Sequence, residues 1–173
     1  MPHSYGHFDD FIRQFLIKHP PTVGVLDIGA GAGKYGRMLR AAFPKMTIDA
    51  VEVWVPYVEQ FKLFDVYNSV LIQNVANILP CVFGKYDLIV LGDILEHLTV
   101  HTALDVLGRI PASTAILVAV PYLYSQGPVD GNVHEAHLQS DLTDAIFRER
   151  YYQFGFKKIF GNNLQGIYYR GVK

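Results

Sequence analysis

The stretch "VLDIGAGAGKYGRML", residues 25–39, decides the fold of this chain. Its apolar first part is typical of a short buried strand that ends at Asp27. Gly31, Gly33 and Gly36 follow in G-x-G-x-x-G spacing, and the residues after them have the periodicity of a helix. A strand, a glycine-rich turn and a helix in this order are typical of the first unit of a doubly wound α/β sheet. The ligand of such a turn lies at the N-terminus of the helix, so the chemistry around the turn indicates which ligand it holds.

Strand-like apolar runs alternate with helical patterns along the rest of the chain, which predicts a mostly parallel sheet covered on both faces. Besides the helix after the glycine turn, helices are expected over Phe8–His19, about Pro56–Phe64, Thr99–Gly108 and about Ser140–Tyr151. Strands are expected over Val23–Asp27, Thr47–Val53, Ser69–Gln73, Tyr86–Gly92, Thr114–Pro121, Phe156–Phe160 and Gly166–Tyr169. The last two strands are joined by a turn short enough for an antiparallel hairpin. We therefore expect residues 1–173 to form one α/β domain with a doubly wound sheet.

Composition bounds the classes of function. The chain has 173 residues, half of them apolar, and a formal net charge of −1 without a basic block, so nucleic-acid binding is not expected. No apolar run approaches the roughly 18 residues that span a bilayer, and the N-terminus lacks the pattern of a signal peptide. A single cysteine, Cys81, allows no disulfide within the chain and fits a reducing compartment. We expect a soluble, cytoplasmic protein without a membrane partner.

Asp27 argues against a pyrophosphate in the glycine turn. A carboxylate two residues before Gly29 would repel a diphosphate a few ångströms away, at a cost of roughly 1–4 kcal/mol. It would favour a ligand with a positive group, and S-adenosylmethionine carries an ammonium and a sulfonium but no phosphate. The alternative is that Asp27 only caps the turn.

Residues 25–39 resemble motif I of the class I S-adenosylmethionine-dependent methyltransferases, and the resemblance extends along most of the chain. "VEVW" resembles the acidic end of the second strand, where Glu52 would bind both ribose hydroxyls. "QNVANILP" resembles the adenine-binding segment, with Asn74 where many relatives carry Asp, and "YDLIVLGDILEHL" resembles the fourth-strand motif. The family implies a seven-stranded, mostly parallel sheet with a C-terminal antiparallel hairpin. The cofactor-binding residues expected on this basis are Asp27, Gly29, Ala30, Gly31, Glu52, Val53, Asn74, Val75 and Gly92.

Two of these assignments have plain alternatives. Glu52 could be a solvated strand end, and Asn74 could cap a turn instead of binding adenine. Glu52 is suited to bind a ribose, because a carboxylate accepts two hydrogen bonds from a vicinal diol and Glu52 follows the strand beside the glycine turn.

"GDILEHL" is the first cluster that could carry chemistry, since it follows the fourth strand. Asp93, Glu96 and His97 would lie near the transferred methyl group, and His97 has an ordinary pKa suited to a general base. In one quinone-biosynthesis branch of the family, a pattern like Asp93-x-x-Glu96-His97 binds a divalent metal. The third possibility is that Glu96 and His97 only shape a turn.

"GNVHEAHLQS" is the second cluster, and it belongs to a long polar loop, residues 122–139, expected on the substrate side. His134 or His137 could act as an acid–base partner. Alternatively, His137 and Ser140 could cap backbone groups at the helix entry, or His134, His137 and His97 could share zinc. The spacing is not the H-E-x-x-H of zinc proteases. We expect Asp93, His97 and His134 as catalytic residues; a divalent metal is possible but not predicted. Residues 1–21 are expected to form a helical lid.

The predicted function is methyl transfer from S-adenosylmethionine to a small-molecule or sugar-like acceptor, at oxygen. The chain lacks the N-P-P-Y or D-P-P-Y sequence of amino-methylating enzymes that act on DNA bases, and its length leaves almost no room for a separate substrate domain. One alternative is an NAD-dependent oxidoreductase that uses the G-x-G-x-x-G turn. Another is a non-catalytic cofactor-binding module on the same fold.

Overall fold

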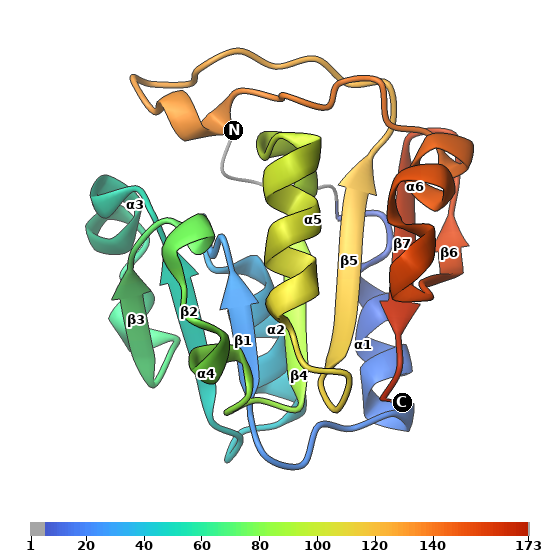
Figure 1. The fold of residues 1–173 in the computed structure, drawn as a ribbon. Coiled ribbons are helices and arrows are strands. Elements are labelled where there is room, and N and C mark those ends of the chain that lie inside the picture. The colour runs from blue at the N-terminus through green and yellow to red at the C-terminus, as the bar shows by residue number, and fades with distance from the viewer. Residues whose placement is uncertain (1–5, 173) are drawn as a thin grey trace.

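A computed structural model describes residues 6–172 and contains one seven-stranded sheet in the order β3-β2-β1-β4-β5-β7-β6 (Figure 1). The strands are β1 Val25–Ile28, β2 Ile48–Glu52, β3 Ser69–Ile72, β4 Leu88–Gly92, β5 Ala115–Pro121, β6 Lys157–Gly161 and β7 Gln165–Arg170. β1 pairs in parallel with β2 and β4, and only β7 runs against its neighbours β5 and β6. The doubly wound sheet with a C-terminal antiparallel hairpin is therefore confirmed.

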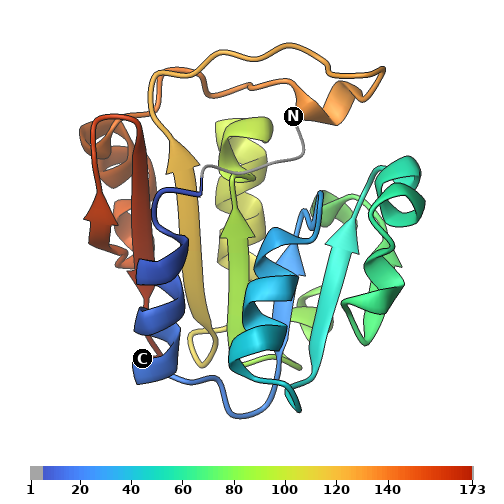
Figure 2. The ribbon, with the colours of Figure 1, turned by 180° about the vertical axis from the view of Figure 1, so that it is seen from behind.

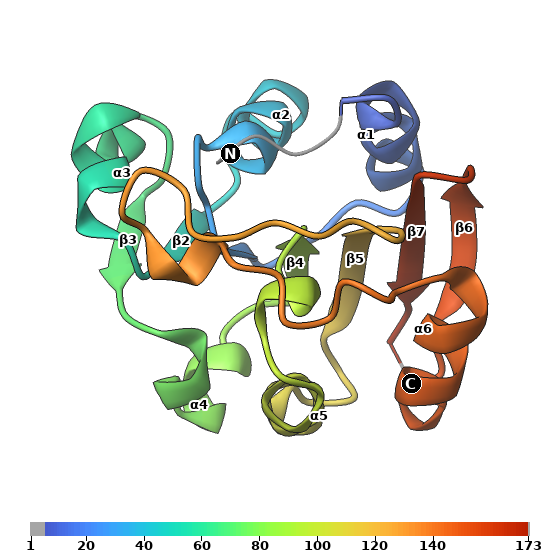
Figure 3. The ribbon, with the colours of Figure 1, turned by 90° about the horizontal axis from the view of Figure 1, so that it is seen from above.

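Helices cover both faces of the sheet, as the view from above shows (Figure 3). One layer contains α1 Asp9–Lys18, α2 Lys34–Ala42 and α3 Val55–Gln60, and the other contains α4 Pro80–Phe83, α5 Val100–Arg109 and α6 Asp144–Tyr151. Every residue of β1, β4 and β5 is buried, as expected for central strands with a helix layer on each side. Among the described residues, no helix is both long and apolar enough to traverse a bilayer.

Three helices depart from the sequence-based expectation. α3 ends at Gln60 instead of about Phe64, and a separate 3-10 helix follows over Leu63–Asp65. α4 was not predicted, because a helix of four residues that opens with Pro80 leaves no periodic signal. α6 starts at Asp144 instead of about Ser140, because Thr143 is its N-cap and accepts a hydrogen bond from the backbone N–H of Ile146 at 3.2 Å.

α1 packs on the sheet as a layer helix and does not form a lid. Phe11 stacks on Phe160 of β6 with ring centroids 4.1 Å apart, and Phe15 meets the edge of Tyr169 of β7 at 4.9 Å. The back view shows α1 lying along the β7 side of the molecule (Figure 2). The lid expected over residues 1–21 thus does not include its helix, and the first five residues lie outside the described part of the chain.

The chain crosses from one half of the sheet to the other between β1 and β4. After β1 it runs outward through β2 and β3, and it then returns to pair β4 with the opposite edge of β1. Ligands of doubly wound sheets bind at the carboxyl ends of the strands, beside this switch point.

Candidate functional site

A cavity of about 420 Å³ lies above the carboxyl ends of β1, β2, β4 and β5, which is the size range of small-molecule sites. Residues 122–139 cross above these strand ends (Figure 1). Six residues of this loop line the cavity: Tyr124, Gln126, Asn132, His134, Glu135 and His137. All the expected cofactor-binding residues except Asp27 line it, and so do Asp93, His97 and His134. From the described N-terminal segment, Gly6 contributes to the wall.

Close packing requires glycine at two points of the wall. Gly29 has a φ of +72°, and a Cβ there would lie 1.8 Å from the side chain of Ile94. A Cβ at Gly92 would lie 1.9 Å from the ring of Tyr35. Any larger residue at either position would have to displace the loop after β4 or a buried tyrosine, and both belong to the cavity wall.

Glu52 ties the end of β2 to the glycine turn. Its Oε2 accepts a hydrogen bond from the backbone N–H of Gly31 at 2.8 Å, and its Oε1 accepts one from Trp54 at 2.8 Å. Burial raises the pKa of Glu52, and these backbone donors act in the opposite direction. Each carboxylate oxygen keeps acceptor capacity for a ligand in the cavity.

Asp27 does not face the cavity, which corrects the argument that made it the deciding acid. Its side chain is buried inside the fold, where Oδ2 accepts a hydrogen bond from the Tyr67 hydroxyl at 2.5 Å and Oδ1 has no hydrogen-bond partner. Burial raises the pKa of Asp27 to about 7, so a large share of it is neutral at physiological pH. Glu52, bonded to the Gly31 amide, is instead the carboxylate beside the turn.

Asn74 adopts the turn-capping role that was its alternative. Its Oδ1 accepts a hydrogen bond from the backbone N–H of Ala76 at 2.9 Å, at the start of the short 3-10 helix Val75–Asn77. The side-chain amide nitrogen is then the group that Asn74 can offer to a ligand in the cavity.

The loop after β4 carries the residues expected to be catalytic. Asp93 has a φ of +55°, an uncommon conformation for a residue other than glycine, and its Oδ1 accepts a hydrogen bond from Gln165 of β7 at 3.2 Å. Unfavourable backbone geometry at a cavity wall is typical of functional positions. His134 also lines the cavity, but its side chain is exposed on the overlying loop.

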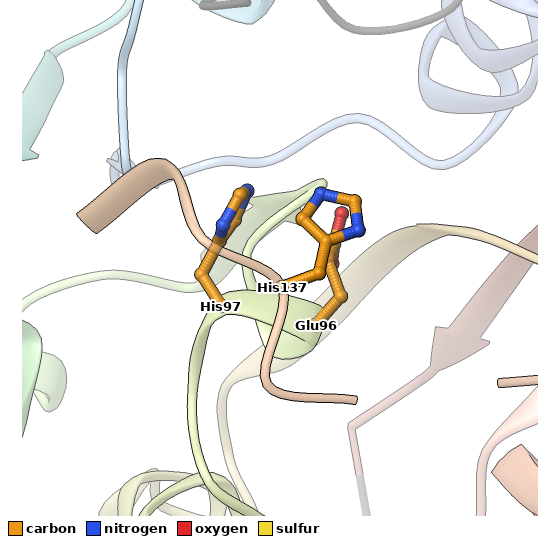
Figure 4. Close-up of side chains that lie close together, drawn as sticks. All are labelled: Glu96, His97 and His137. Atoms are coloured by element: carbon orange, nitrogen blue, oxygen red, sulfur yellow. The ribbon is translucent and has the colours of Figure 1, made fainter. Parts of the chain in front are cut away.

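Glu96, His97 and His137 meet at one end of the cavity, where the 3-10 helix Leu95–His97 faces the overlying loop (Figure 4). The two imidazole rings are 4.6 Å apart and nearly perpendicular. Burial, together with the neighbouring His137, lowers the pKa of His97 to about 4, so His97 is neutral at physiological pH. Burial and the nearby charge of Asp93 raise the pKa of Glu96.

Solved structures with this fold are known, although no protein-family model and no curated protein matches the sequence. The N-terminal domain of EvdMO1, crystallised with SAH (S-adenosylhomocysteine) bound, matches with a TM-score of 0.72 and 16% identity over 98% of this chain and 83% of that chain. An O-methyltransferase family protein from Burkholderia thailandensis matches with a TM-score of 0.66 and 12% identity over 96% of this chain and 55% of the other. RosA, the N,N-8-amino-8-demethyl-D-riboflavin dimethyltransferase of Streptomyces davawensis, matches with a TM-score of 0.63 and 20% identity over 93% and 53%.

The chain has the class I methyltransferase fold. It spans most of the EvdMO1 domain but only about half the length of the other two proteins. The fold is thus shared by sequences that have little identity.

Backbone hydrogen bonds hold the overlying loop against the short helix of this methyltransferase fold. The backbone N–H groups of Leu138 and Gln139 donate to the carbonyl of Glu96 at 2.7 and 3.0 Å. The side-chain amide of Gln139 donates to the carbonyls of Leu95 and Leu98 at 2.7 and 3.0 Å. These bonds place His137 beside Glu96 and His97.

The expected catalytic set omitted Glu96 and His137. Both residues stand in the two polar clusters noted in the sequence, where zinc shared by His97, His134 and His137 was only one alternative. A third residue, Tyr35 in the first turn of α2, was not among the expected site residues. Its hydroxyl is buried, has no hydrogen-bond partner and belongs to a residue that lines the cavity. The sequence offered one signal that Tyr35 borders the cavity, namely its position in the first helical turn after the glycine loop.

Proposed function

We propose that this protein transfers a methyl group from S-adenosylmethionine to an oxygen of a small-molecule or sugar-like acceptor. The observation that carries the proposal is the arrangement of one cavity. Its cofactor side holds Glu52 and the glycine turn, and its other side holds Asp93, Glu96, His97 and His137. The fold supports it, since structures that share it include proteins named as O-methyltransferases. The EvdMO1 domain has also been crystallised in the presence of SAH and D-fucose.

The cofactor is assigned to the side of the cavity formed by β1 and β2. Glu52 would accept hydrogen bonds from the two ribose hydroxyls with the acceptor capacity that the Gly31 and Trp54 amides leave. Asn74 would donate from its amide nitrogen to the adenine edge, and Gly29 allows the backbone to approach the ligand closely.

The acceptor is assigned to the side below the loop of residues 122–139. Its hydroxyl oxygen would attack the methyl carbon in line with the carbon–sulfur bond, and that bond's electron pair would stay on sulfur. His97 would accept the hydroxyl proton because it lines the cavity and is neutral, and its lowered pKa makes it a weaker base than an ordinary histidine. Asp93 would position the reacting groups, whereas His134, at the exposed rim, would contact the acceptor.

An NAD-dependent oxidoreductase is the less favoured alternative. The Gly31 amide, which a diphosphate in this turn would need as a hydrogen-bond donor, already donates to Glu52 at 2.8 Å.

Calorimetric titration with S-adenosylhomocysteine and with NAD tests the cofactor assignment. We expect the adenosyl ligand to bind and NAD not to bind. Glu52→Ala should weaken binding of the adenosyl ligand at least about 30-fold, because two hydrogen bonds to a charged acceptor are lost. Glu59→Ala, an exposed glutamate on α3, is the matched control and should leave the affinity unchanged. Tight NAD binding, or equal affinity in both variants, would overturn the assignment.

Turnover tests the reaction itself. A panel of hydroxylated small molecules that includes deoxysugars is incubated with S-adenosylmethionine, and methylated products are detected by mass spectrometry. His97→Ala should slow the reaction while retaining cofactor affinity. Cofactor binding with no turnover on any acceptor would favour the non-catalytic module.

A further inference from the structure

Glu96, His97 and His137 are arranged as a set of metal ligands. One potential ligand atom from each residue lies within 4.8 Å of the other two. Figure 4 shows the three side chains rising side by side, two from the short helix after β4 and one from the overlying loop. A metal with bonds of about 2.0–2.2 Å holds its ligand atoms roughly 3–3.5 Å apart, so modest side-chain movements would close the set.

The Glu96 carboxylate lacks a partner, which is the second observation. Its side chain is 1% exposed, and neither of its oxygens has a hydrogen-bond partner. A buried carboxylate without donors is costly, and native proteins compensate such a group with a proton or a cation. The two neighbouring imidazoles turn this position into a place for a cation with nitrogen and oxygen ligands.

The two histidines are held in the orientation that metal-binding histidines adopt. Nδ1 of His97 lies 3.2 Å from the carbonyl of Ala136, and Nδ1 of His137 lies 2.8 Å from the carbonyl of Tyr124. A carbonyl only accepts, so each Nδ1 carries the proton and each Nε2 keeps a lone pair. A backbone carbonyl on one ring nitrogen is the usual outer contact of a histidine that ligates through the other.

The ligand types select the class of metal. Two imidazoles and one carboxylate suit zinc and the other divalent transition metals, whereas magnesium and calcium prefer sets of oxygen ligands. Three protein ligands are also the number found at catalytic zinc sites, where the fourth position stays open for water or substrate.

We propose that Glu96, His97 and His137 bind one divalent transition metal ion, with zinc as the reference ion, and that its open position faces the acceptor side of the cavity. The proposal of metal binding depends only on these three residues, whereas a role for the metal toward the acceptor rests on the proposed methyl transfer. A hydroxyl bound to the ion would release its proton to solvent more readily. The same oxygen would then attack the methyl carbon, the carbon–sulfur bond would break, and its electron pair would remain on sulfur. His97 would in that case act as a ligand and no longer as the proton acceptor.

The test is metal binding by the full chain after dialysis against a chelator. Zinc is titrated by calorimetry, and cobalt(II) is added separately because its visible absorption reports the coordination geometry. We expect one ion per chain and a cobalt spectrum typical of four or five ligands. Glu96→Gln and His137→Ala should each weaken zinc binding at least about 100-fold. His101→Ala, which removes an exposed histidine of α5, is the matched control and should bind zinc as the unmodified chain does.

Two further readouts separate the possible failures. Circular dichroism and S-adenosylhomocysteine affinity show whether each variant is folded, so weaker zinc binding by a folded variant counts for the site. Equal zinc affinity in all three variants and the unmodified chain would overturn the metal site. Zinc binding without any adenosyl-ligand binding would overturn the proposed function and leave the metal site standing. Turnover that survives complete chelation would remove the metal from the reaction.

Discussion

Replacing Asp27 with asparagine should relieve a pH-dependent cost that the native chain carries. The carboxylate is 1% exposed and accepts a hydrogen bond from the Tyr67 hydroxyl. Burial is the main cause that raises the pKa of Asp27 from 3.8 to about 7, and the Tyr67 hydrogen bond offsets only part of it. Asparagine keeps an acceptor for Tyr67 and never becomes charged. The native chain should therefore lose stability relative to Asp27→Asn as the pH rises.

The sign and size of this stability change follow from the pKa of Asp27 in the unfolded chain, 3.8, and in the folded protein, about 7. Because the pKa is higher in the folded state, protonated Asp27 stabilises the fold. This contribution to the free energy of unfolding is fully present below pH 3.8 and is lost as the pH rises through about 7. The full difference between the two pKa values corresponds to about 4 kcal/mol in the free energy of unfolding. Between pH 5 and pH 8, the native protein should lose about 3 kcal/mol of unfolding free energy relative to Asp27→Asn. The value is below the full difference of about 4 kcal/mol because part of the loss has already occurred at pH 5.

Urea unfolding of both proteins at pH 5, 6, 7 and 8 measures this loss. Most other titrating groups are present in both proteins, so their contributions largely cancel in the difference. Tyr67→Phe should move the transition of Asp27 to higher pH, because the lost hydroxyl favoured the charged carboxylate. A difference between native and Asp27→Asn that stays constant over this range would refute the reasoning. A carboxyl resonance of Asp27 that titrates near its ordinary pKa would refute it as well.

The remaining predictions concern packing. Gly36→Ala should destabilise the fold by about 2 kcal/mol, since a Cβ there would lie 2.3–2.4 Å from the ring and hydroxyl of Tyr67. Gly108→Ala, with nothing within 4 Å of the added Cβ, should be neutral or stabilise α5 by up to about 1 kcal/mol, and thermal unfolding of the pair checks both. Gln139→Ala should cost about 1–3 kcal/mol and speed amide exchange around His137, because buried carbonyls lose their donors. Unchanged exchange there would contradict the role of Gln139 in holding the loop.

The elements could largely be predicted because their signals are local. β4 and β5 are continuous apolar runs, and such runs belong to central parallel strands. The position of Glu52 beside the glycine turn was also predictable, since the carboxyl ends of parallel neighbours meet at one edge of the sheet. The start of α6 was predicted too early, because several polar residues precede it and only the fold shows that Thr143 is the cap.

The face of the sheet to which the Asp27 side chain points could not be predicted from the sequence. Successive strand side chains point to opposite faces, and a strand buried on both faces gives no contrast to show which face is which. The partner that decides the matter is Tyr67, forty residues away in the chain. The sequence therefore predicted an acid at this strand end but assigned it to the wrong surroundings.

Local pattern alone was enough to determine the sheet, its glycine turn and the polar residues at the strand ends, because periodicity and turn chemistry act over a few neighbouring residues. Only the tertiary structure decided that Glu52 and not Asp27 borders the cavity, and that His137 meets Glu96 and His97. The contact of His137 depends on backbone hydrogen bonds between the overlying loop and the short helix after β4, and the placement of Glu52 and Asp27 depends on their bonds to Gly31 and Tyr67. Bonds between segments so far apart in the chain leave no trace in the pattern of either segment.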